Sequence, residues 1–426
     1  MTLISLLNLL VNYKGFVATS DKLFQDQSGE KRIEVYYRPR KGSKGKCPQC
    51  GRPCPTYDTN RRPRQFEFVP IFMIPIFIVY HMRRVKCPVH GVKTEQVPWS
   101  DGKSDLTTIY SQFLGNWARR LSYREVANYF HTSDGKVFRS VQSLVEWGLK
   151  HRKLEGIKSI GVDEICYRVG RTFMTLVYQI DDGCVRLLHA TTERKEKSLI
   201  SFFAMLNRGR VGINKLSNGI KYVCSDMWRP YMNAIGRWCR NAVHVLDRFH
   251  IKKHLNEAVD QTRRETLARL KQKGKGEELQ LRGSKYLFLK NKEKLSSSQI
   301  LQLQTLLKIN LPIVRAYLLK EDFDRFWEYS SSYWAGKFLK KWNARTMRSK
   351  VKPMKDFVRM LRRHESLVMN WFQCKWLSNG IVEGLNNKAK TVVKRSYGFR
   401  TAEGLKIALY HNLGNLPEPE VTHRFW

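Results

Sequence analysis

The sequence is poor in acidic residues compared with basic ones. Among 426 residues there are 37 Asp and Glu against 77 Lys and Arg, a formal net charge of +40. An excess that is spread along the whole chain indicates a polyanionic partner, and DNA or RNA is the first candidate. A membrane surface is less favoured, because no amphipathic anchor or lipidation motif accompanies the charge.

Long uninterrupted hydrophobic runs are also lacking. The most apolar window, 66–80, is broken by Pro70 and Pro75 and is too short to span a bilayer. The opening run MTLISLLNLLVNYKG has neither a basic leader nor a small-residue cleavage site, so we expect an amphipathic helix and not a signal peptide. We expect a cytoplasmic protein with no membrane partner. With 42% hydrophobic residues, the chain can bury cores for two or three globular domains.

Cysteine is sparse, with nine residues in an odd and uneven set. This distribution argues against a disulfide framework and favours metal binding near the N-terminus. The segments CPQCG at 47–51 and CPVHG at 87–91 each place two ligands three residues apart before a glycine. Two such knuckles predict a tetrahedral structural Zn²⁺ site. The predicted ligands are Cys47, Cys50, Cys87 and His90, with Cys54 as an alternative ligand.

Free thiols in a reducing cytosol are the competing interpretation of these cysteines. Between the knuckles, 66–85 is extended in character and predicts a hairpin or small sheet. Basic residues flank the knuckles and suggest phosphate contacts by this module. They are Arg61, Arg62, Arg64, Arg83, Arg84 and Lys86.

The segment 106–150 is helical in pattern and includes the spacing of a helix-turn-helix. Apolar residues from Tyr123 to Phe130 line one face of a first helix, and Thr132 or Ser133 would cap a second. Any helical hairpin can imitate this pattern, but the large positive charge favours DNA binding. The residues that the second helix would offer to a groove are Asp134, Lys136, Arg139 and Gln142.

From residue 157 the pattern changes to strands. Strands at 157–163, 172–180 and 185–190 precede a helix at 195–206, a strand ending at 226, a helix at 230–240 and a strand at 243–247. Three antiparallel strands followed by alternating helix and strand predict a ribonuclease H-like α/β domain. Asp163 and Asp226 each end a hydrophobic strand, so neighbouring strand ends would bring them together. A carboxylate there either binds a metal ion or caps a turn, and the repetition favours the metal.

Asp247 and His250 lie in the segment DRFH that follows the last of these strands. They could orient the site or cap the next helix, and the sequence does not decide between the two. Residues 250 to about 375 predict an all-helical insertion. Beyond it, one helical face carries Glu383, Asn386, Asn387 and Lys390, and Gly384 suggests a close backbone approach.

Together, CPQCG, CPVHG, GVDE at 161–164, SDMWRPYMNAI at 225–235, DRFH and NGIVEGLNNKAK at 379–390 resemble a DDE transposase of the ISL-three insertion-sequence family. The resemblance covers nearly the whole chain. It implies Asp163, Asp226 and Glu383 as a catalytic triad that binds two Mg²⁺ or Mn²⁺ ions, with Lys390 matching the lysine after the glutamate. Lys394 and Arg395 are further candidates for DNA contacts.

The implied activity is binding of the element's terminal inverted repeats, metal-dependent end cleavage and strand transfer into target DNA. The protein would be prokaryotic, nucleoid-associated on DNA, and at least a homodimer when two ends are joined. The alternatives are a catalytically silent DNA-binding regulator and a ribonuclease H-like nuclease or resolvase. The expected domains are an N-terminal helix (1–30), a zinc module (31–100), a helix-turn-helix domain (101–153), a catalytic core in two parts (154–250 and 376–426) and a helical insertion (251–375).

Overall fold

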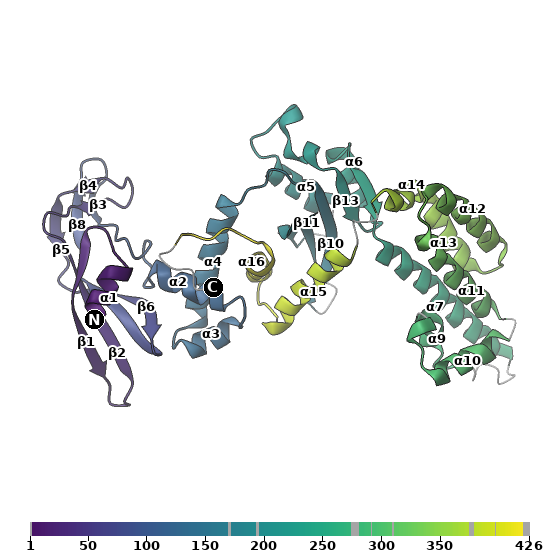
Figure 1. The fold of residues 1–426 in the computed structure, drawn as a ribbon, viewed down its shortest axis with the longest axis horizontal. Coiled ribbons are helices and arrows are strands. Elements are labelled where there is room, and N and C mark those ends of the chain that lie inside the picture. The colour runs from purple at the N-terminus through teal and green to yellow at the C-terminus, as the bar shows by residue number, and fades with distance from the viewer. Residues whose placement is uncertain are drawn as a thin grey trace. The chain divides into compact units, whose positions relative to one another are not determined.

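The computed structural model describes residues 2–168, 172–192, 196–273, 281–290, 292–308, 311–374, 379–396 and 398–420. The chain divides into two compact units. The first unit combines Met1–Lys153 with Thr391–Trp426, and the second is Leu154–Lys390 (Figure 1).

The first unit begins with a helix packed on a four-stranded sheet. The expected N-terminal helix over 1–30 is wrong in extent, because α1 ends at Leu10 and strand β1 follows. Gly15, at φ +87°, provides the turn, and the Asn8 amide bonds the Ala18 backbone through both its oxygen and its nitrogen. The helix therefore shares one core with the sheet, around the fully buried Trp99. The elements are α1 Leu3–Leu10 and a sheet of order β1-β2-β7-β6, with β1 Phe16–Gln25, β2 Lys31–Pro39, β6 Arg64–Ile71 and β7 Ile74–Tyr80.

Two smaller sheets carry the cysteine knuckles, and the antiparallel hairpin of β6 and β7 confirms the extended structure predicted between them. One is the pair of β3 Gly45–Lys46 and β4 Pro53–Cys54. The other is a three-stranded sheet of order β5-β8-β9, with β5 Thr56–Thr59, β8 Arg83–Cys87 and β9 Gly91–Thr94.

Helices complete the first unit. A capping box joins Ser122 to Glu125 at the start of α3, and the Ser133 hydroxyl caps α4. The helices are α2 Thr108–Trp117, α3 Tyr123–Tyr129, α4 Asp134–His151 and α16 Ala402–Leu413.

The second unit contains a five-stranded sheet of order β12-β11-β10-β13-β14. Strands β10, β11 and β12 are antiparallel, and β10, β13 and β14 are parallel. The five predicted strands are confirmed, but the first does not end at Asp163: β10 continues to Arg168 because Asp163 to Cys166 pair with β11. The elements are β10 Ser159–Arg168, β11 Thr172–Asp181, β12 Cys184–Thr191, α5 Glu196–Leu206, β13 Tyr222–Ser225, α6 Arg229–Trp238 and β14 Val243–Leu246.

Helices fill the described part of the chain between β14 and α15 (Asn379–Arg395), as predicted. They have a core of their own, in which Phe323 and Trp342 are almost completely buried. No helix among the described residues is long and apolar enough to cross a membrane. The helices are α7 Arg248–Lys273, α9 Lys285–Leu289, α10 Ser297–Leu307, α11 Pro312–Asp324, α12 Ser332–Arg348, α13 Lys352–Arg363 and α14 Glu365–Met369.

Helix α15 packs against β10. A Cβ atom added to Gly161 of β10 would lie 2.6 Å from Cγ2 of Val382, so this glycine permits the close approach. Gly384 was expected to have that role, but its added Cβ would meet nothing within 4 Å, and the residue is exposed. The close contact therefore depends on the strand glycine.

Candidate functional site

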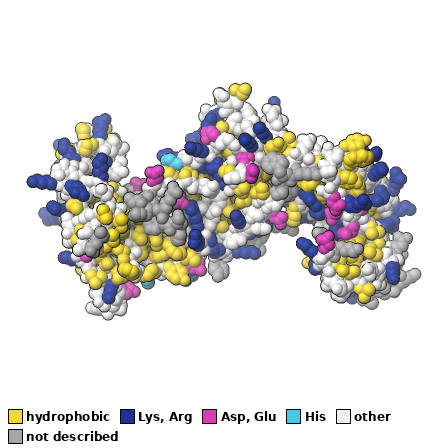
Figure 2. All heavy atoms as spheres, viewed as in Figure 1, with side chains coloured by type: hydrophobic (Ala, Val, Ile, Leu, Met, Phe, Trp, Pro, Cys, Tyr) yellow, Lys and Arg dark blue, Asp and Glu magenta, His cyan; other side chains and the backbone are white. Residues whose placement is uncertain are grey.

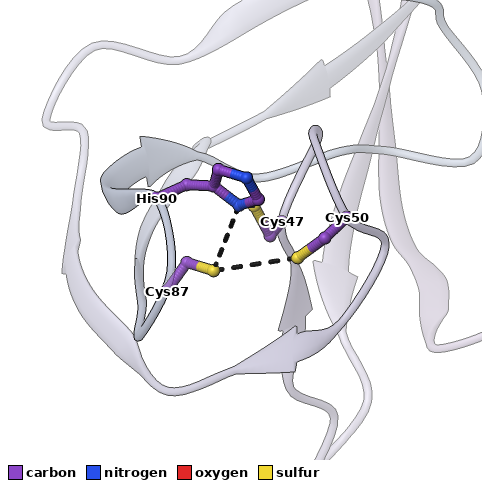
Figure 3. Close-up of side chains that lie close together, drawn as sticks. All are labelled: Cys47, Cys50, Cys87 and His90. Carbon is purple, nitrogen blue, oxygen red and sulfur yellow. Dashed lines mark hydrogen bonds between the residues drawn. The ribbon is translucent and has the colours of Figure 1, made fainter.

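The two knuckles bring Cys47, Cys50, Cys87 and His90 together, with their ligand atoms within 4.8 Å of one another (Figure 3). Nδ1 of His90 lies 3.7 Å from Sγ of Cys47 and 3.6 Å from Sγ of Cys87, and the sulfurs of Cys50 and Cys87 are 3.7 Å apart. Ligands at the usual distances from a tetrahedral zinc ion stand about 3.3–3.8 Å apart. The four predicted residues thus have the spacing that a structural zinc ion requires.

Cys54 does not join this group. Its thiol donates to the carbonyl oxygen of Arg52 at 3.4 Å.

Within the group, the Cys87 thiol has a lowered pKa. Burial raises the pKa of this thiol, but the backbone N–H groups of Val89 and His90 and the neighbouring thiols outweigh burial and bring the pKa down to about 7. A thiol that ionises this readily is prepared to bind metal as a thiolate.

Strand β8 leads into the second knuckle and carries two adjacent arginines with different surroundings. Arg83 is 7% exposed, and its guanidinium donates to both carboxylate oxygens of Glu95. The structure therefore removes Arg83 from the candidate DNA contacts, because the buried carboxylate holds it. Arg84 points to the other face, is 46% exposed and pairs with Asp58 at the surface. Only Arg84 of this pair remains accessible to a phosphate.

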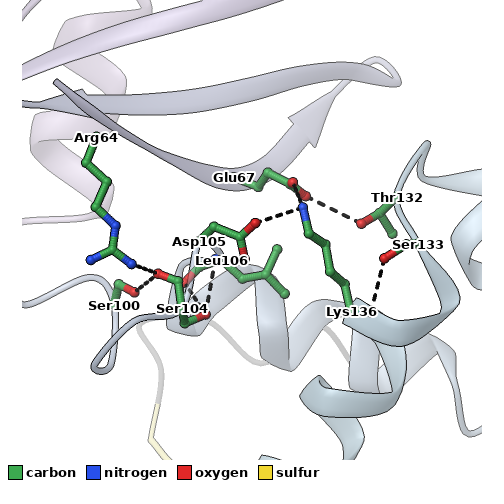
Figure 4. Close-up of polar contacts among 9 residues, drawn as sticks. All are labelled: Arg64, Glu67, Ser100, Ser104, Asp105, Leu106, Thr132, Ser133 and Lys136. Carbon is green, nitrogen blue, oxygen red and sulfur yellow. Dashed lines mark hydrogen bonds and ion pairs between the residues drawn. The ribbon is translucent and has the colours of Figure 1, made fainter. Parts of the chain in front are cut away.

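The predicted groove-facing residues of α4 also separate into two kinds. Lys136 pairs with Glu67 of β6 and with Asp105, the latter at 3.0 Å, and Thr132 bonds Glu67 as well (Figure 4). Lys136 was expected to contact DNA, but these two carboxylates engage its ammonium group. Arg139 is exposed, whereas Gln142 donates to Glu146 at 2.8 Å.

Arg395, near the C-terminal end of α15, donates to the Arg119 carbonyl at 2.6 Å and to Asn412 at 3.1 Å. These hydrogen bonds hold the last turn of α15 within the first unit, so the Arg395 guanidinium has a structural role there. Lys390 and Lys394, on the same helix, are exposed. On the face drawn in Figure 2, Lys and Arg side chains are scattered over both units and acidic ones are few.

In the second unit, three carboxylates lie at one edge of the sheet. Gly161 of β10 pairs with Cys224 of β13, so Asp163 and Asp226 occupy corresponding positions two residues further on. Ser225 pairs with Leu246 of β14, which aligns Asp226 with Asp247 in the same way. The parallel strand register thus predicts a row of Asp163, Asp226 and Asp247.

Asp226 and Asp247 are held by the same type of local bond. Oδ1 of Asp226 accepts the backbone N–H of Trp228 at 3.0 Å before α6, and Oδ1 of Asp247 accepts that of Phe249 at 2.7 Å at the start of α7. Asp226 therefore fixes the turn that leads into α6, whereas Asp247 caps the N-terminus of α7. Asp247 thus caps α7 with Oδ1, as one of its two interpretations predicted, while its Oδ2 faces His250 in the site.

Asp163 is bonded by α15 through a buried chain of side chains. Asn386 donates its Nδ2 to Oδ2 of Asp163 at 2.5 Å, and the buried Tyr178 hydroxyl donates to Oδ1 of Asn386 at 3.0 Å. Residues 161 and 163 share one face of β10 about 6.7 Å apart, and residues 382 and 386 share one face of α15 about 6 Å apart. This match lets Val382 sit on Gly161 while Asn386 reaches Asp163. Nothing in the sequence pattern identified Tyr178.

His250, one turn into α7, faces two of the carboxylates. Its Nε2 lies 3.6 Å from Oδ1 of Asp163 and 3.8 Å from Oδ2 of Asp247. These three residues form the second group in the described chain that could hold a metal ion. The sequence had singled out His250 without a role, and its spacing of three from Asp247 was the available signal.

The electrostatics of this edge follow from its burial. Burial raises the pKa of the Asp247 carboxyl from 3.8 to about 6, partly offset by His250 and by backbone hydrogen bonds. Burial lowers the pKa of His250, but the nearby carboxylates of Asp163 and Asp247 outweigh it, so the pKa of His250 is raised overall. Holding the negative charge of Asp247 is therefore costly at this edge, and a cation beside the carboxylate would lower that cost.

Glu383 does not belong to this group. It lies on α15 one turn before Asn386, and its side chain is exposed. The helix that carries it is nevertheless fixed to Asp163 by the Asn386 bond. The described structure therefore brings together Asp163, Asp247 and His250, with Asp226 in the row position between the two aspartates and Glu383 on the helix that packs against β10.

Two family models match the chain. One, described as a transposase of the ISL3 DDE type, covers residues 160–409, more than half of the chain and all three predicted catalytic acids. The other, described as a zinc-finger of transposases IS204, IS1001, IS1096 and IS1165, covers residues 43–90 and all four knuckle ligands. Both sites thus lie within segments that are typical of transposases.

Individual relatives agree with the family models. The transposase for insertion sequence element IS1557 of Mycobacterium tuberculosis is 25% identical over 412 residues, 90% of this chain and 89% of that protein, in strains CDC 1551 and H37Rv. The transposase for insertion sequence element IS1001 of Bordetella parapertussis is 25% identical over 361 residues, 84% of this chain and 86% of that protein. The chain belongs to the ISL3 family of DDE transposases, the enzymes of insertion sequences, as its motifs had suggested.

Proposed function

We propose that this transposase cleaves and joins DNA at a two-metal carboxylate site in a ribonuclease H-like core. The observation that carries the proposal is the alignment of Asp163 and Asp226 at one sheet edge, beside a helix that is bonded to Asp163. The strand order, with three antiparallel strands followed by two parallel ones, supports the assignment of the core. Carboxylate oxygens are the ligands that Mg²⁺ and Mn²⁺ prefer.

In this proposal Asp163 is shared by both ions, and Asp226 and Glu383 each bind one. Glu383 is exposed, so its carboxylate is accessible to an ion and to DNA. Lys390 lies two turns further along α15 and is also exposed, which suits a contact with a phosphate of the substrate. Asn386, between them, holds Asp163 in a fixed orientation.

The reaction has two phosphoryl-transfer steps. Bound divalent ions would make a water or hydroxyl more nucleophilic and stabilise the leaving oxygen. In the first step water hydrolyses the phosphodiester at the end of the element and releases a 3′-hydroxyl. In the second step that hydroxyl attacks a phosphodiester of target DNA, and the 3′-oxygen of the target strand leaves.

Recognition of the terminal inverted repeats falls to the first unit in this proposal. Helices α3 and α4 have the caps and spacing of a helix-turn-helix, and Arg139 is exposed near the start of α4. Arg84 and Lys394 are the other accessible cations among the predicted contacts. Gln142 lies three residues after Arg139, on the same face of α4. Joining two element ends requires at least a homodimer on DNA.

The test is cleavage and strand transfer on a duplex that carries the terminal repeat flanking the gene in its genome. Wild type with Mg²⁺ is expected to nick at the repeat boundary, and EDTA is expected to abolish nicking. Glu383→Gln should lose cleavage and keep repeat binding. Glu403→Gln, an exposed carboxylate of α16 that pairs with Lys406, is the matched control and should cleave normally. Tight repeat binding without cleavage by zinc-loaded wild type would instead identify a DNA-binding regulator.

A further inference from the structure

Asp163, Asp247 and His250 converge at the sheet edge with the spacing of metal ligands. The imidazole Nε2 lies 3.6 Å from one carboxylate oxygen and 3.8 Å from the other. Both separations exceed the usual length of an N–H···O hydrogen bond, about 2.7–3.2 Å. They are close to the 3.6–3.7 Å separations in the zinc group of the same chain. A common ion between the three groups accounts for this spacing better than direct hydrogen bonds do.

In each carboxylate, the oxygen that does not face His250 accepts a hydrogen bond, and this bond orients the oxygen that does. Asn386 donates to Oδ2 of Asp163, and the Phe249 N–H donates to Oδ1 of Asp247. Oδ1 of Asp163 accepts the backbone N–H of Glu164 at 2.7 Å, and the same oxygen lies 3.6 Å from Nε2 of His250. Oδ2 of Asp247 faces the same ring nitrogen.

Burial makes this arrangement costly without a cation. Asp247 is 7% exposed, and the side chains of Asp163 and His250 are about four-fifths buried, at 18% and 21% exposed. Two carboxylates facing one another in such a place repel unless a positive charge lies between them. A divalent ion provides two charges and satisfies all three ligands at once.

We propose that Asp247 and His250 are ligands, together with Asp163, of one of the divalent ions of this transposase. The inference deepens the proposed two-metal function and rests on it for the role of Asp163. It adds an imidazole to a site otherwise built of carboxylates. Because imidazole nitrogen suits transition metals better than Mg²⁺, the ion at this position is predicted to be bound more tightly when it is Mn²⁺.

The decisive measurement is pulsed electron paramagnetic resonance of Mn²⁺ bound to the full-length, zinc-loaded protein. A directly bound imidazole gives a nitrogen coupling in the spin-echo modulation. The coupling is expected in wild type and in His254→Ala, and it is expected to be absent in His250→Ala and His250→Gln. His254 is the matched control because it lies one turn further along α7, is 48% exposed and pairs with Glu257. Thermal unfolding and zinc content establish that each variant is folded.

Titration of Mn²⁺ and Mg²⁺ by calorimetry gives the second readout. His250→Ala and Asp247→Asn are expected to weaken Mn²⁺ binding about tenfold or more, and His250→Ala should lose the preference for Mn²⁺ over Mg²⁺. A folded His250→Ala protein that keeps wild-type Mn²⁺ affinity, or a wild-type complex without nitrogen coupling, would overturn the proposal.

The two proposals fail in different ways. Metal-dependent cleavage that requires Glu383, together with an unchanged Mn²⁺ site in His250→Ala, would reject the ligand assignment and retain the two-metal function. Nitrogen coupling that disappears in His250→Ala, in a wild-type protein that cleaves no terminal repeat, would retain the ligand assignment and reject the proposed function.

Discussion

The zinc group and the carboxylate site are assembled from the chain in opposite ways. All four zinc ligands come from two short knuckles in one small β module, and the separation in sequence between first and last is 43 residues. The carboxylate site combines strand ends with a helix that returns after the helical insertion, so its bond between Asp163 and Asn386 spans 223 residues. The first site is local, whereas the second depends on the whole second unit.

This difference has a consequence for stability. The zinc module has a small core of its own, in which Cys47, Cys54, Val85 and Cys87 are the buried members, so the metal must contribute to its folding. The carboxylate site lies in a unit with two large cores, and it keeps a buried acid whose pKa is raised. Loss of a ligand should therefore destabilise the first site, and loss of a charge should stabilise the second.

The largest effect is expected for Cys87→Ser. Loss of this thiolate should release the zinc ion and unfold the module, because apparent zinc binding energies in such sites are about 10–16 kcal/mol. Zinc content by mass spectrometry and the unfolding transition of the first unit measure the result. Cys54→Ser is the control and should keep one zinc ion per chain, since the Cys54 thiol donates to the Arg52 carbonyl and lies outside the four-ligand group. Zinc loss in Cys54→Ser would make that residue a ligand.

A smaller effect is expected where α15 meets β10. Gly161→Ala places a methyl group 2.6 Å from Val382 and should cost about 3 kcal/mol by overpacking. It should also reduce cleavage, because α15 carries Asn386 and Glu383. The paired control is Gly384→Ala on the same helix, whose methyl group meets open space and should stabilise the helix by about 0.5–1 kcal/mol. Denaturant unfolding compares the two, and equal effects would show that the contact is not tight.

The sequence predicted the local site almost completely. Knuckle spacing alone identified Cys47, Cys50, Cys87 and His90, because ligands within a turn are constrained by that turn. It also predicted the order of the five strands along the chain and singled out Asp163 and Asp226 from the hydrophobic runs before them, although β10 continues past Asp163 to Arg168.

What the sequence could not give were contacts set by register and by packing between distant elements. The bond from Tyr178 through Asn386 to Asp163 requires the α15 face to align with β10, and no pattern in either segment encodes that alignment. For the same reason Lys136, Arg83 and Arg395 were predicted to contact DNA. Each is a cation on a polar face in sequence, and each meets a carboxylate or carbonyl from elsewhere in the fold.

The opposite sign is expected for Asp247→Asn in the metal-free second unit. Asn retains the oxygen that accepts the Phe249 N–H. It removes the carboxylate charge of Asp247, and burial raises the pKa of that carboxyl to about 6. The variant should be more stable than wild type by at most about 3 kcal/mol at pH 8. Because the folded-state pKa lies above the ordinary 3.8, this destabilising contribution is full above pH 6 and disappears as the pH falls toward 4. Unfolding in EDTA would remove the structural zinc as well, so Mg²⁺- and Mn²⁺-free buffer with zinc retained is the right condition. A stability difference that does not change between pH 8 and pH 4 would contradict this account.

The smallest effect on stability is expected for Arg84→Ala. This variant tests whether DNA binding by the zinc module can be changed without changing cleavage at the carboxylate site. Arg84 precedes the second knuckle, and its ion pair with Asp58 is exposed, so the unfolding midpoint and zinc content should not change. If this residue contacts a phosphate, its loss should weaken terminal-repeat binding uniformly and reduce the salt slope of the affinity by about one. Cleavage per bound complex should stay at the wild-type level, because the carboxylate site is untouched. Lowered cleavage at saturating DNA would mean that the zinc module also positions the strand for chemistry, and the two sites would then act as one.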